Sequence, residues 1–460
     1  MSHLRCGAWA LFACGFVCGV RAQEEGTPTV DRTGTCYTVH WDGGTEAPAE
    51  LALQAVERVF PLVAATFGVA DTKPATPLDV HLYRTFAGYE AAEKRLTDGR
   101  FARNLAMCHF DSKSAHVALQ PPCTDATLRA IGLPGLTVRM LAWEATHAAR
   151  YELCTNFRDH PDWFADGLAA WASGQVVAAL RPGAVDGDPL DDTHLVLVQR
   201  LLTAKRLPPV QDVLADAIDD LDFTDRYAVR AVLFAFLQGD RHRQKLATVA
   251  GRIRSTGGGA GLRAEVLAAA KRAFGSGIDR EFRAFVTKRE PRWEEVFRSL
   301  APGADGEWVQ VAFPERNAVA WNLAPARGGR LQLSGELRIL PGGRQQMNVL
   351  FGRTEADGFC SIAFVADFGF TVFRFDPASG WTRIGDANAP ALRPGYTTAF
   401  AIEVDGTALQ VRLGEQSWQF TLPERLPPQV SWGLGVQAGP EGGDTGSAGV
   451  WTNVKVGGRK

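Results

Sequence analysis

Apolar positions in the first 300 residues mostly follow the spacing of an amphipathic helix, interrupted by short stretches with period two. The alternating stretches predict strands at 36–42, 77–84 and 114–121, and helical spacing predicts helices at 46–68 and 86–96. Helical spacing then dominates almost to residue 300, with a last predicted helix over 279–300. The pattern therefore predicts a mostly helical region with a small N-terminal sheet, an α+β arrangement.

The pattern changes after residue 308 to short runs with period two, separated by turn residues. Examples are GRLQLSGELRIL, CSIAFVAD, FTVFRFD, TTAFAIEVDG and VSWGLGVQAG. Residues 301–308, APGADGEW, have the Gly, Pro and Asp content of a linker. We therefore expect a helical domain at 34–300, a linker at 301–308 and an antiparallel β-sandwich at 309–460.

Residues 1–22 have a basic start, an apolar stretch and a small-residue ending at Ala22, which is the pattern of a signal peptide. We interpret the protein as exported, to the periplasm or the extracellular space. A second interpretation takes LFAC, ending at Cys14, as a lipoprotein cleavage site, although the apolar run before it is short. No later apolar run reaches the ~18 residues that a transmembrane helix needs.

Charge argues against one class of partner. The formal net charge is −2 and no extended basic field is present, so we expect no nucleic-acid binding. The basic cluster at 241–254, RHRQKLATVAGRIR, is typical of the solvated face of a single helix.

Four cysteines of the first half, Cys36, Cys108, Cys123 and Cys154, allow three disulfide pairings in an oxidising compartment. Cys108 with Cys123 is the first pairing to test. The alternative is that all four are small buried thiols.

The segment AWEATHAARYEL places Trp143, Glu144 and His147 on one face of a helix. In the H-E-x-x-H helix of zinc peptidases, the two His bind zinc and the Glu activates the metal-bound water. A third ligand usually comes from a later helix. Here the segment DHPDWFADGLAAWASG, 159–174, offers Asp166.

In their order and spacing, these segments resemble the gluzincin metallopeptidases, specifically the bacterial peptidase-MA-like group. That group has H-E-x-x-H followed by Pro-x-Trp-x-x-Glu-Gly-x-Ala, and the matching residues here are Pro161, Trp163, Phe164, Gly167, Leu168 and Ala169. The resemblance covers roughly residues 35–290, including 225–237 and 274–286. It implies a gluzincin-like domain in which His147 and Asp166 hold the metal-ligand positions and Glu144 the general-base position.

The chain departs from that family at the metal site itself. Trp143 stands in the first ligand position, and its indole N–H is a donor with no lone pair for a metal. Asp166 is an acceptable ligand, although one methylene shorter than Glu. Because His147 and Asp166 alone are fewer than the usual three protein ligands, we expect a vestigial site with no bound cofactor. The indole would fill the volume of the metal, and Glu144 would pair with His147.

Two alternatives stay open for this helix. Zinc would bind if His109, His116 or His160 replaced the missing ligand, and the protein would then be an active metallopeptidase. Alternatively, a Trp, a Glu and a His on one face are ordinary core packing beside a satisfied His–Glu pair. Tyr227 lies in a later helical segment, either near the cleft or in the core.

The C-terminal region resembles the concanavalin-like and laminin-G-like jelly rolls, through GVWTNVKVGG and IEVDGTALQVRLG. Such folds often bind carbohydrate through surface aromatics, and Trp381 in SGWTRIGD is the candidate residue. The alternative is that Trp381, Trp418, Trp432 and Trp451 all serve core or edge packing.

The leading hypothesis is an exported pseudoenzyme that binds a peptide or a polysaccharide without catalysis. The first alternative is an active zinc metallopeptidase with substituted ligands. The second is a carbohydrate-binding protein that acts through the C-terminal sandwich.

Overall fold

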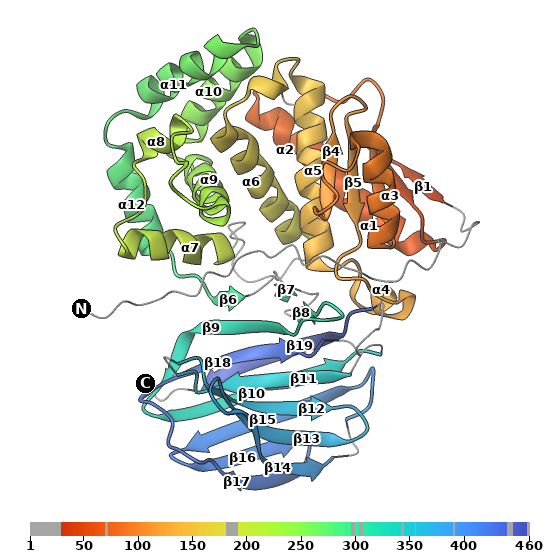
Figure 1. The fold of residues 1–460 in the computed structure, drawn as a ribbon, viewed down its shortest axis with the longest axis vertical. Helices are drawn as coiled ribbons and strands as arrows, with labels where there is room; N and C mark the ends of the chain where they lie inside the picture. Colours follow the sequence, from red (N-terminus) through yellow and green to blue (C-terminus); the bar gives the residue numbers. More distant parts are fainter. Residues whose placement is uncertain are drawn as a thin grey trace.

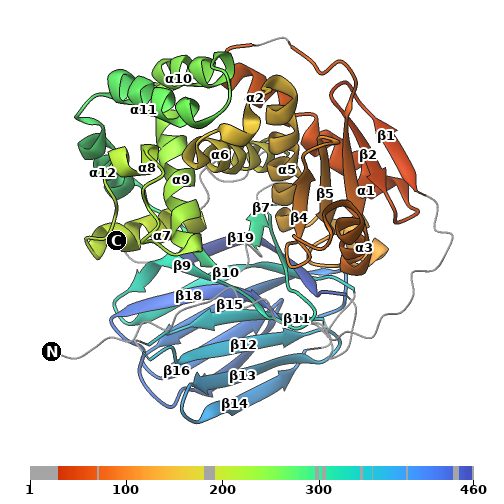
Figure 2. The ribbon, with the colours of Figure 1, turned by 45° about the horizontal axis from the view of Figure 1, so that its top comes forward.

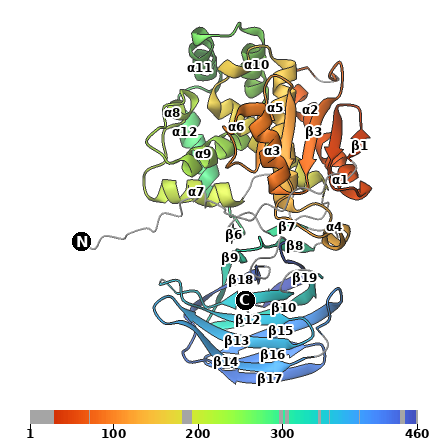
Figure 3. The same cartoon turned by 45° about the vertical axis from the view of Figure 1, so that its right-hand side comes forward.

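The computed structural model describes residues 29–69, 72–180, 192–295, 300–302, 307–341, 345–354, 356–389, 392–438 and 445–457. The expected signal peptide at 1–22 lies outside these residues. Figure 1 shows a mostly helical part above a β-sandwich, and Figure 3 shows the same division after rotation. The predicted α+β class is confirmed.

The helical part contains a five-stranded sheet with the order β1-β2-β3-β5-β4. Its strands are β1 (Val30–Thr33), β2 (Tyr37–Trp41), β3 (Leu78–Tyr83), β4 (Ala106–His109) and β5 (Ser114–Ala118). β2, β3 and β5 are parallel neighbours and correspond to the three predicted strands. β1 and β4 pair antiparallel at the two edges, and each is only four residues long, too short for a clear alternation.

Twelve α-helices are described. They are α1 (Glu46–Val56), α2 (Val59–Thr66), α3 (Phe86–Thr97), α4 (Asp125–Ile131), α5 (Gly135–Leu153), α6 (Asp162–Leu180), α7 (Asp192–Thr203), α8 (Val210–Leu214), α9 (Phe223–Leu237), α10 (Arg243–Ser255), α11 (Ala260–Phe274) and α12 (Ile278–Lys288). The helix predicted at 46–68 is thus divided into α1 and α2. In Figure 2, α5 lies beside the sheet, and α6 and α9 follow it away from the sheet.

The helix predicted over 279–300 is wrong in its second half. α12 ends at Lys288, and Trp293–Glu295 form strand β6 instead. Pro291 explains the difference, because proline lacks the amide hydrogen of a helix interior and disfavours helical backbone at the residue before it.

The C-terminal part consists of two seven-stranded sheets, ordered β17-β16-β15-β10-β19-β8-β7 and β14-β13-β12-β11-β18-β9-β6. The strands are β6 (Trp293–Glu295), β7 (Leu300–Pro302), β8 (Trp308–Val311), β9 (Ala318–Arg327), β10 (Arg330–Ile339), β11 (Gln346–Phe351), β12 (Phe359–Val365), β13 (Gly369–Asp376), β14 (Gly380–Asn388), β15 (Thr397–Asp405), β16 (Ala408–Leu413), β17 (Gln416–Thr421), β18 (Gln429–Val436) and β19 (Ala448–Gly457). A core of apolar residues fills the space between the sheets. The predicted sandwich is confirmed.

Strand pairing of the sandwich begins before residue 309. β6 pairs with β9, and β7, which overlaps the expected linker, pairs with β8. The two parts also touch: the main-chain N–H of Gly446 donates to the Pro122 carbonyl at 2.7 Å, and that of Trp293 donates to Asp192 at 3.1 Å. The division into 34–300, 301–308 and 309–460 as independent units stays a prediction.

Candidate functional site

Three helices bring the residues singled out in the sequence to one place. Trp143, Glu144 and His147 lie on α5, and Asp166 lies on α6, which packs against α5 on one side and α9 on the other. Gly167 permits the close approach of α6 and α9, because a Cβ there would lie 2.6 Å from the Cβ of Phe234 and 3.0 Å from the Arg230 carbonyl oxygen. The charge of Asp166 acts on Glu144, so these two positions lie near each other, and the metal-site roles of the predicted residues stay predictions.

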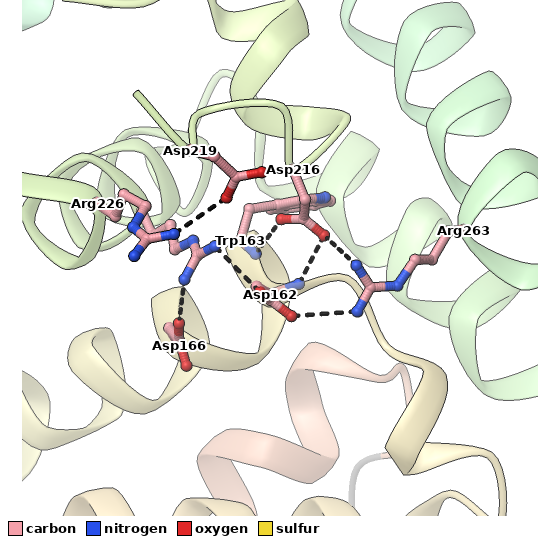
Figure 4. A network of polar contacts seen from close by, with 8 residues as sticks. Asp162, Trp163, Asp166, Asp216, Asp219, Arg226 and Arg263 are labelled. Carbon is pink, nitrogen blue, oxygen red and sulfur yellow. Dashed lines mark hydrogen bonds and ion pairs between the residues drawn. The ribbon is translucent and has the colours of Figure 1, made fainter. Parts of the chain in front are cut away.

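An ion-pair network joins α6 to the helices around it (Figure 4). Arg230 on α9 donates to Asp166 at 2.8 Å and to Asp162 at 3.1 Å. Arg263 on α11 reaches Asp162 at 3.2 Å and Asp216 at 3.1 Å. Asp216 also accepts the main-chain N–H groups of Asp162 and Trp163 and so caps the start of α6.

Sequence reasoning missed Arg230, whose side chain is only 9% exposed. The available signal was a charged residue inside the otherwise apolar run AVRAVLFAFL, which requires a buried carboxylate partner. Arg230 also changes the interpretation of Asp166, because the carboxylate expected to face a metal faces a guanidinium group.

The expected pairing of Glu144 with His147 is wrong. Nδ1 of His147 lies 3.2 Å from a guanidinium nitrogen of Arg150, one turn later on α5. The Trp143 ring contacts both His147 and Tyr227, with ring centroids 6.0 and 5.7 Å apart. Among the described residues, the Glu144 carboxyl has no hydrogen-bond or ion-pair partner.

These residues do not fit a zinc ion in the arrangement that the structure shows. A guanidinium group only donates, so Nδ1 of His147 accepts and the ring proton sits on Nε2. A zinc-binding His instead offers one ring nitrogen to the metal and donates from the other. Trp143 has no lone pair to offer, and the Asp166 carboxylate is held by Arg230.

The three replacement histidines are bonded elsewhere. His109 contacts Ser112, His116 lies between Tyr83 and Ser114, and His160 lies between Asn156 and Arg150. Across the described ranges, no group of three His, Cys, Asp or Glu side chains is placed to hold a metal ion.

The carboxyl groups of Glu144 and Asp166 have raised pKa values. Burial, followed by the charge of Asp166, raises the pKa of Glu144 to about 8. Burial also raises the pKa of Asp166 to about 6, although Arg230 works in the opposite direction. Burial and the nearby Arg150 lower the pKa of His147 well below its usual range, so this ring is neutral at pH 7.

A cavity of about 330 Å³ opens beside the network. It is lined by Asp162, Asp166, Phe223, Arg226, Tyr227 and Arg230. Tyr227 therefore lies at the cleft, one of its two expected locations. Cavities with converging polar groups and perturbed pKa values are common places for ligands to bind.

The cysteines of the first half do not form the pairing proposed first. Cys36, Cys108, Cys123, Cys154 and Cys360 are all free and buried. Cys123 instead donates its thiol to the Pro121 carbonyl at 3.3 Å. The alternative of small buried thiols describes these residues.

In the described part of the chain, no helix is both long and apolar enough to span a bilayer.

A second candidate site lies on the sandwich. Trp381 on β14 is 55% exposed, whereas Trp432 and Trp451 are buried and Trp418 is partly buried against the sandwich core. The packing alternative therefore holds for three of these tryptophans and fails for Trp381. The side chain of Trp381 lies against Phe359, Phe373 and Phe375, at centroid distances of 5.6, 5.8 and 4.9 Å.

This cluster continues along the outer side of its sheet. Neighbouring residues Cys360 and Val372 point into the core, so Phe359 and Phe373 point outward. Trp321 on β9 joins at 5.6 Å from Phe359, and the Arg353 guanidinium lies over it at 5.5 Å. We name Trp321, Phe359, Phe373, Phe375 and Trp381 the aromatic patch.

No family model matches the chain, and no curated protein matches it. These comparisons give no support to the gluzincin resemblance. Among solved structures, the sandwich resembles carbohydrate-binding modules and galectin-like folds.

The carbohydrate binding module CBM66 from Bacillus subtilis is 14% identical, over 36% of this chain and 94% of that chain, with a TM-score of 0.30. A toad ovary galectin in complex with thio-digalactose is 9% identical, over 31% and 98%, with a TM-score of 0.23. The exoplasmic/lumenal domain of VIP36, in its Ca2+/Man3GlcNAc-bound form, is 15% identical, over 37% and 86%, with a TM-score of 0.28. At these scores the likenesses carry no argument about function.

Proposed function

We propose that this protein binds carbohydrate through the aromatic patch of its C-terminal sandwich. The observation that carries the proposal is the exposed indole of Trp381, held in place by the rings of Phe359, Phe373 and Phe375. Exposing a large aromatic side chain costs hydrophobic free energy, and clusters of this kind mark binding surfaces.

The surroundings of the patch suit a sugar ring. A flat aromatic face packs against the C–H face of a pyranose, while polar neighbours bond its hydroxyl groups. Thr371 on β13 and Asp386 on β14 are registered partners on the same side of the sheet as Phe373. Asn348 on β11 lies farther along that side. A mixed aromatic and polar surface supports carbohydrate more than a purely apolar partner.

We propose that the helical part is non-catalytic, and that the protein acts outside the cytoplasm. The first proposal rests on Arg150 and Arg230, which hold the His147 and Asp166 positions where a zinc peptidase needs free ligands. The second rests on the signal-peptide pattern of residues 1–22.

The test is a glycan array on the full chain, followed by titration calorimetry with each oligosaccharide that binds. The variant Trp381→Ala should weaken binding at least about tenfold, equivalent to ~1.4 kcal/mol, because the ring is the exposed centre of the patch. Its melting temperature should stay close to that of the parent, since an exposed side chain contributes little to the core.

Tyr396→Ala is the matched control. Tyr396 is also an exposed aromatic residue, at 66%, and lies outside the aromatic patch. Binding should be unchanged in this variant. An array with no bound glycan, or equal losses in both variants, would reject carbohydrate binding by the patch.

A further inference from the structure

Positive charge is concentrated in the last three helices of the helical part. Residues 240–290 contain 12 Lys and Arg against 5 Asp and Glu, whereas residues 23–239 contain 19 against 29. The small net charge of −2 is therefore the sum of two regions of opposite sign. The basic run at 241–254 belongs mostly to α10, and α11 and α12 add further cations to it.

The ends of these three helices meet around His242. Nε2 of His242, at the start of α10, lies 3.1 Å from Glu281 on α12. Its ring centroid lies 6.3 Å from that of Phe274, the last residue of α11. α10 and α11 lie side by side at the end of the helical part that is farther from the sandwich (Figure 1, Figure 3). The start of α10, the end of α11 and the start of α12 are therefore neighbours.

Six cations lie within three positions of one of these three residues along the chain. We name them the basic cluster: Arg241, Arg243, Lys245, Lys271, Arg272 and Arg280. All six are exposed. Arg241 pairs with Glu281 at 3.1 Å and Arg243 with Asp240 at 3.4 Å. Within the described ranges, the side chains of the other four have no ion-pair or hydrogen-bond partner.

Only part of this charge is explained by the helices themselves. Lys271 and Arg272 lie in the last turn of α11, where the helix dipole favours cations. The start of α10 is the opposite case, because a helix N-terminus already carries partial positive charge. Its first turn contains no acidic residue, and Arg243 and Lys245 add to the positive charge there. Repulsion among these like charges costs free energy that an anionic partner would offset.

The free cations form a row rather than a pocket. Lys245 and Arg252, also exposed and without an ion pair in the described part of the chain, are seven positions apart on α10. They therefore share a face and lie ~10 Å apart along the helix. None of the described residues of 240–290 is an exposed large apolar side chain that could enter a bilayer or stack on bases. Separated charges on a polar surface match a linear polymer with a repeated anionic group.

We propose that the basic cluster binds an acidic polysaccharide through the carboxylate or sulfate groups of its sugar units. Lys and Arg form charge-assisted hydrogen bonds to such groups, and several weak contacts to one chain reinforce each other. The site lies on the helical part, so it does not depend on carbohydrate binding by the aromatic patch.

Three polysaccharides test the cluster on the full chain by calorimetry. Polygalacturonate supplies carboxylates, heparin supplies sulfates as well, and dextran is neutral. At least one acidic polymer should bind, and its affinity should fall at least about tenfold between about 50 and 200 mM NaCl, because binding releases counterions. Dextran should not compete. No binding of either acidic polymer at the lower salt concentration, or an affinity independent of salt, would overturn the proposal.

The decisive variant combines Lys245→Gln, Lys271→Gln, Arg272→Gln and Arg280→Gln. It should weaken binding about tenfold or more, because it removes the four cations that have no partner among the described residues. Its melting temperature should stay close to that of the parent, since all four side chains are exposed. If this variant fails to fold, the pair Lys271→Gln and Arg272→Gln replaces it, with an expected loss of about threefold.

The matched control combines Lys73→Gln, Arg103→Gln, Arg129→Gln and Lys205→Gln. These four cations are also exposed, have no ion pair within the described ranges and lie outside α10, α11 and α12. The control changes the net charge by the same amount and should bind like the parent. An equal loss in both variants would show that net charge alone drives binding, and would reject the cluster as a site.

Two other probes test the class of partner. Vesicles of phosphatidylcholine with phosphatidylglycerol represent an anionic lipid surface, and a DNA duplex represents nucleic acid. If either bound more tightly than both acidic polysaccharides, this partner would be rejected. Trp381→Ala should leave the binding of polygalacturonate and heparin unchanged, so failure of this proposal and failure of the aromatic patch are distinguishable.

Discussion

Arg150 and Arg230 supply positive charge at two positions where the resemblance of the sequence to zinc peptidases implied metal ligands. Arg230 neutralises Asp166 directly, and Arg150 fixes the tautomer of His147. A buried carboxylate needs a positive partner, and a guanidinium group provides it here. Glu144 is left without such a partner among the described residues, and its pKa is raised to about 8.

The sequence predicted the helix face that these residues share, but it did not predict their hydrogen-bond and ion-pair partners. Helical spacing placed Trp143, Glu144 and His147 on one face, and the later segment supplied Asp166, whose charge acts on Glu144. The partner of each side chain was beyond such reasoning, because Arg230 lies 64 positions from Asp166. Nothing in local spacing specifies which residues of α6 and α9 meet.

We expect Glu144→Gln to stabilise the protein at neutral pH and to change its pH dependence. The pKa of Glu144 is about 8 in the folded state and 4.5 by its ordinary value. Between these values the unfolded chain is ionised and the folded one protonated, so folding stability falls as pH rises through this window.

The Gln variant lacks this titration. Its free energy of unfolding should exceed that of the parent by about 1–2 kcal/mol at pH 8, and the difference should shrink towards pH 4.5. Urea denaturation at several pH values measures it. A constant difference from pH 5 to 8 would contradict the raised pKa.

At the level of elements, three parallel strands carry a row of stacked histidines. His40 on β2, His81 on β3 and His116 on β5 are registered neighbours, with ring centroids 4.6 Å apart at both steps. Burial, followed by His40, lowers the pKa of His81 to about 4, and burial, followed by His81, lowers that of His116 to about 3. At neutral pH these two rings are therefore uncharged.

Helices and strands could be predicted from the sequence where their segments were long and their apolar spacing regular. Period-two runs predicted the sandwich strands, and α5 and α6 followed from 3.6-residue spacing. The four-residue edge strands β1 and β4 carry too few positions for a period, and the end of α12 depended on Pro291 rather than on apolar spacing. The pairing of strands that are distant in sequence depends on tertiary contacts, so local apolar spacing does not predict it.

We expect His81→Phe to make the protein more resistant to acid. His81 is neutral when folded and takes up a proton below its ordinary pKa of 6.5 when unfolded, so stability falls as pH drops from 6.5 towards 4. Phenylalanine keeps the stacked ring and cannot titrate. The gain should be about 1–2 kcal/mol at pH 4 relative to pH 7, allowing for partial exposure of the site.

His40→Phe is the control with the opposite sign. Burial lowers the pKa of His40, but hydrogen bonds to Asp79 and Asp31 outweigh it and raise that pKa. Its stabilising contribution is therefore present at acidic pH and lost as pH rises through the folded pKa. Chemical denaturation at pH 4–8 should show that the change in unfolding free energy depends on pH in opposite directions for His81→Phe and His40→Phe. The same direction in both variants would contradict the pKa shifts of these two histidines.

At the scale of the whole molecule, the helical part and the sandwich share one continuous packed region. The same apolar cluster as the helices contains Leu340, directly after β10, and four residues of sandwich strands, Val309, Val311, Ala448 and Val450. Glu294 on β6 bridges Arg200 of α7 and Arg353 beside the aromatic patch. The change of sequence pattern near residue 301 therefore predicts a change of fold type more directly than a break between independent units.

The start of the sandwich can be located by comparing two fragments, 290–460 and 309–460. The longer fragment retains β6 and β7, including Trp293, which is 5% exposed and lies 5.7 and 5.3 Å from the rings of Trp308 and Trp432. We expect it to melt cooperatively. The shorter fragment lacks an edge strand of each sheet and also Trp308 at the start of β8. It should be less stable by about 3–5 kcal/mol, the usual cost of removing a buried Trp.

Trp293→Ala in the longer fragment separates the effect of this ring from that of the strands. Because the ring fills a space between Trp308 and Trp432, the variant should lose most of the same 3–5 kcal/mol while retaining both strands. Thermal melting and urea denaturation of the three proteins measure the order of stability. If 309–460 proved as stable as 290–460, strands β6 and β7 would be dispensable, and the predicted boundary at 301–308 would stand.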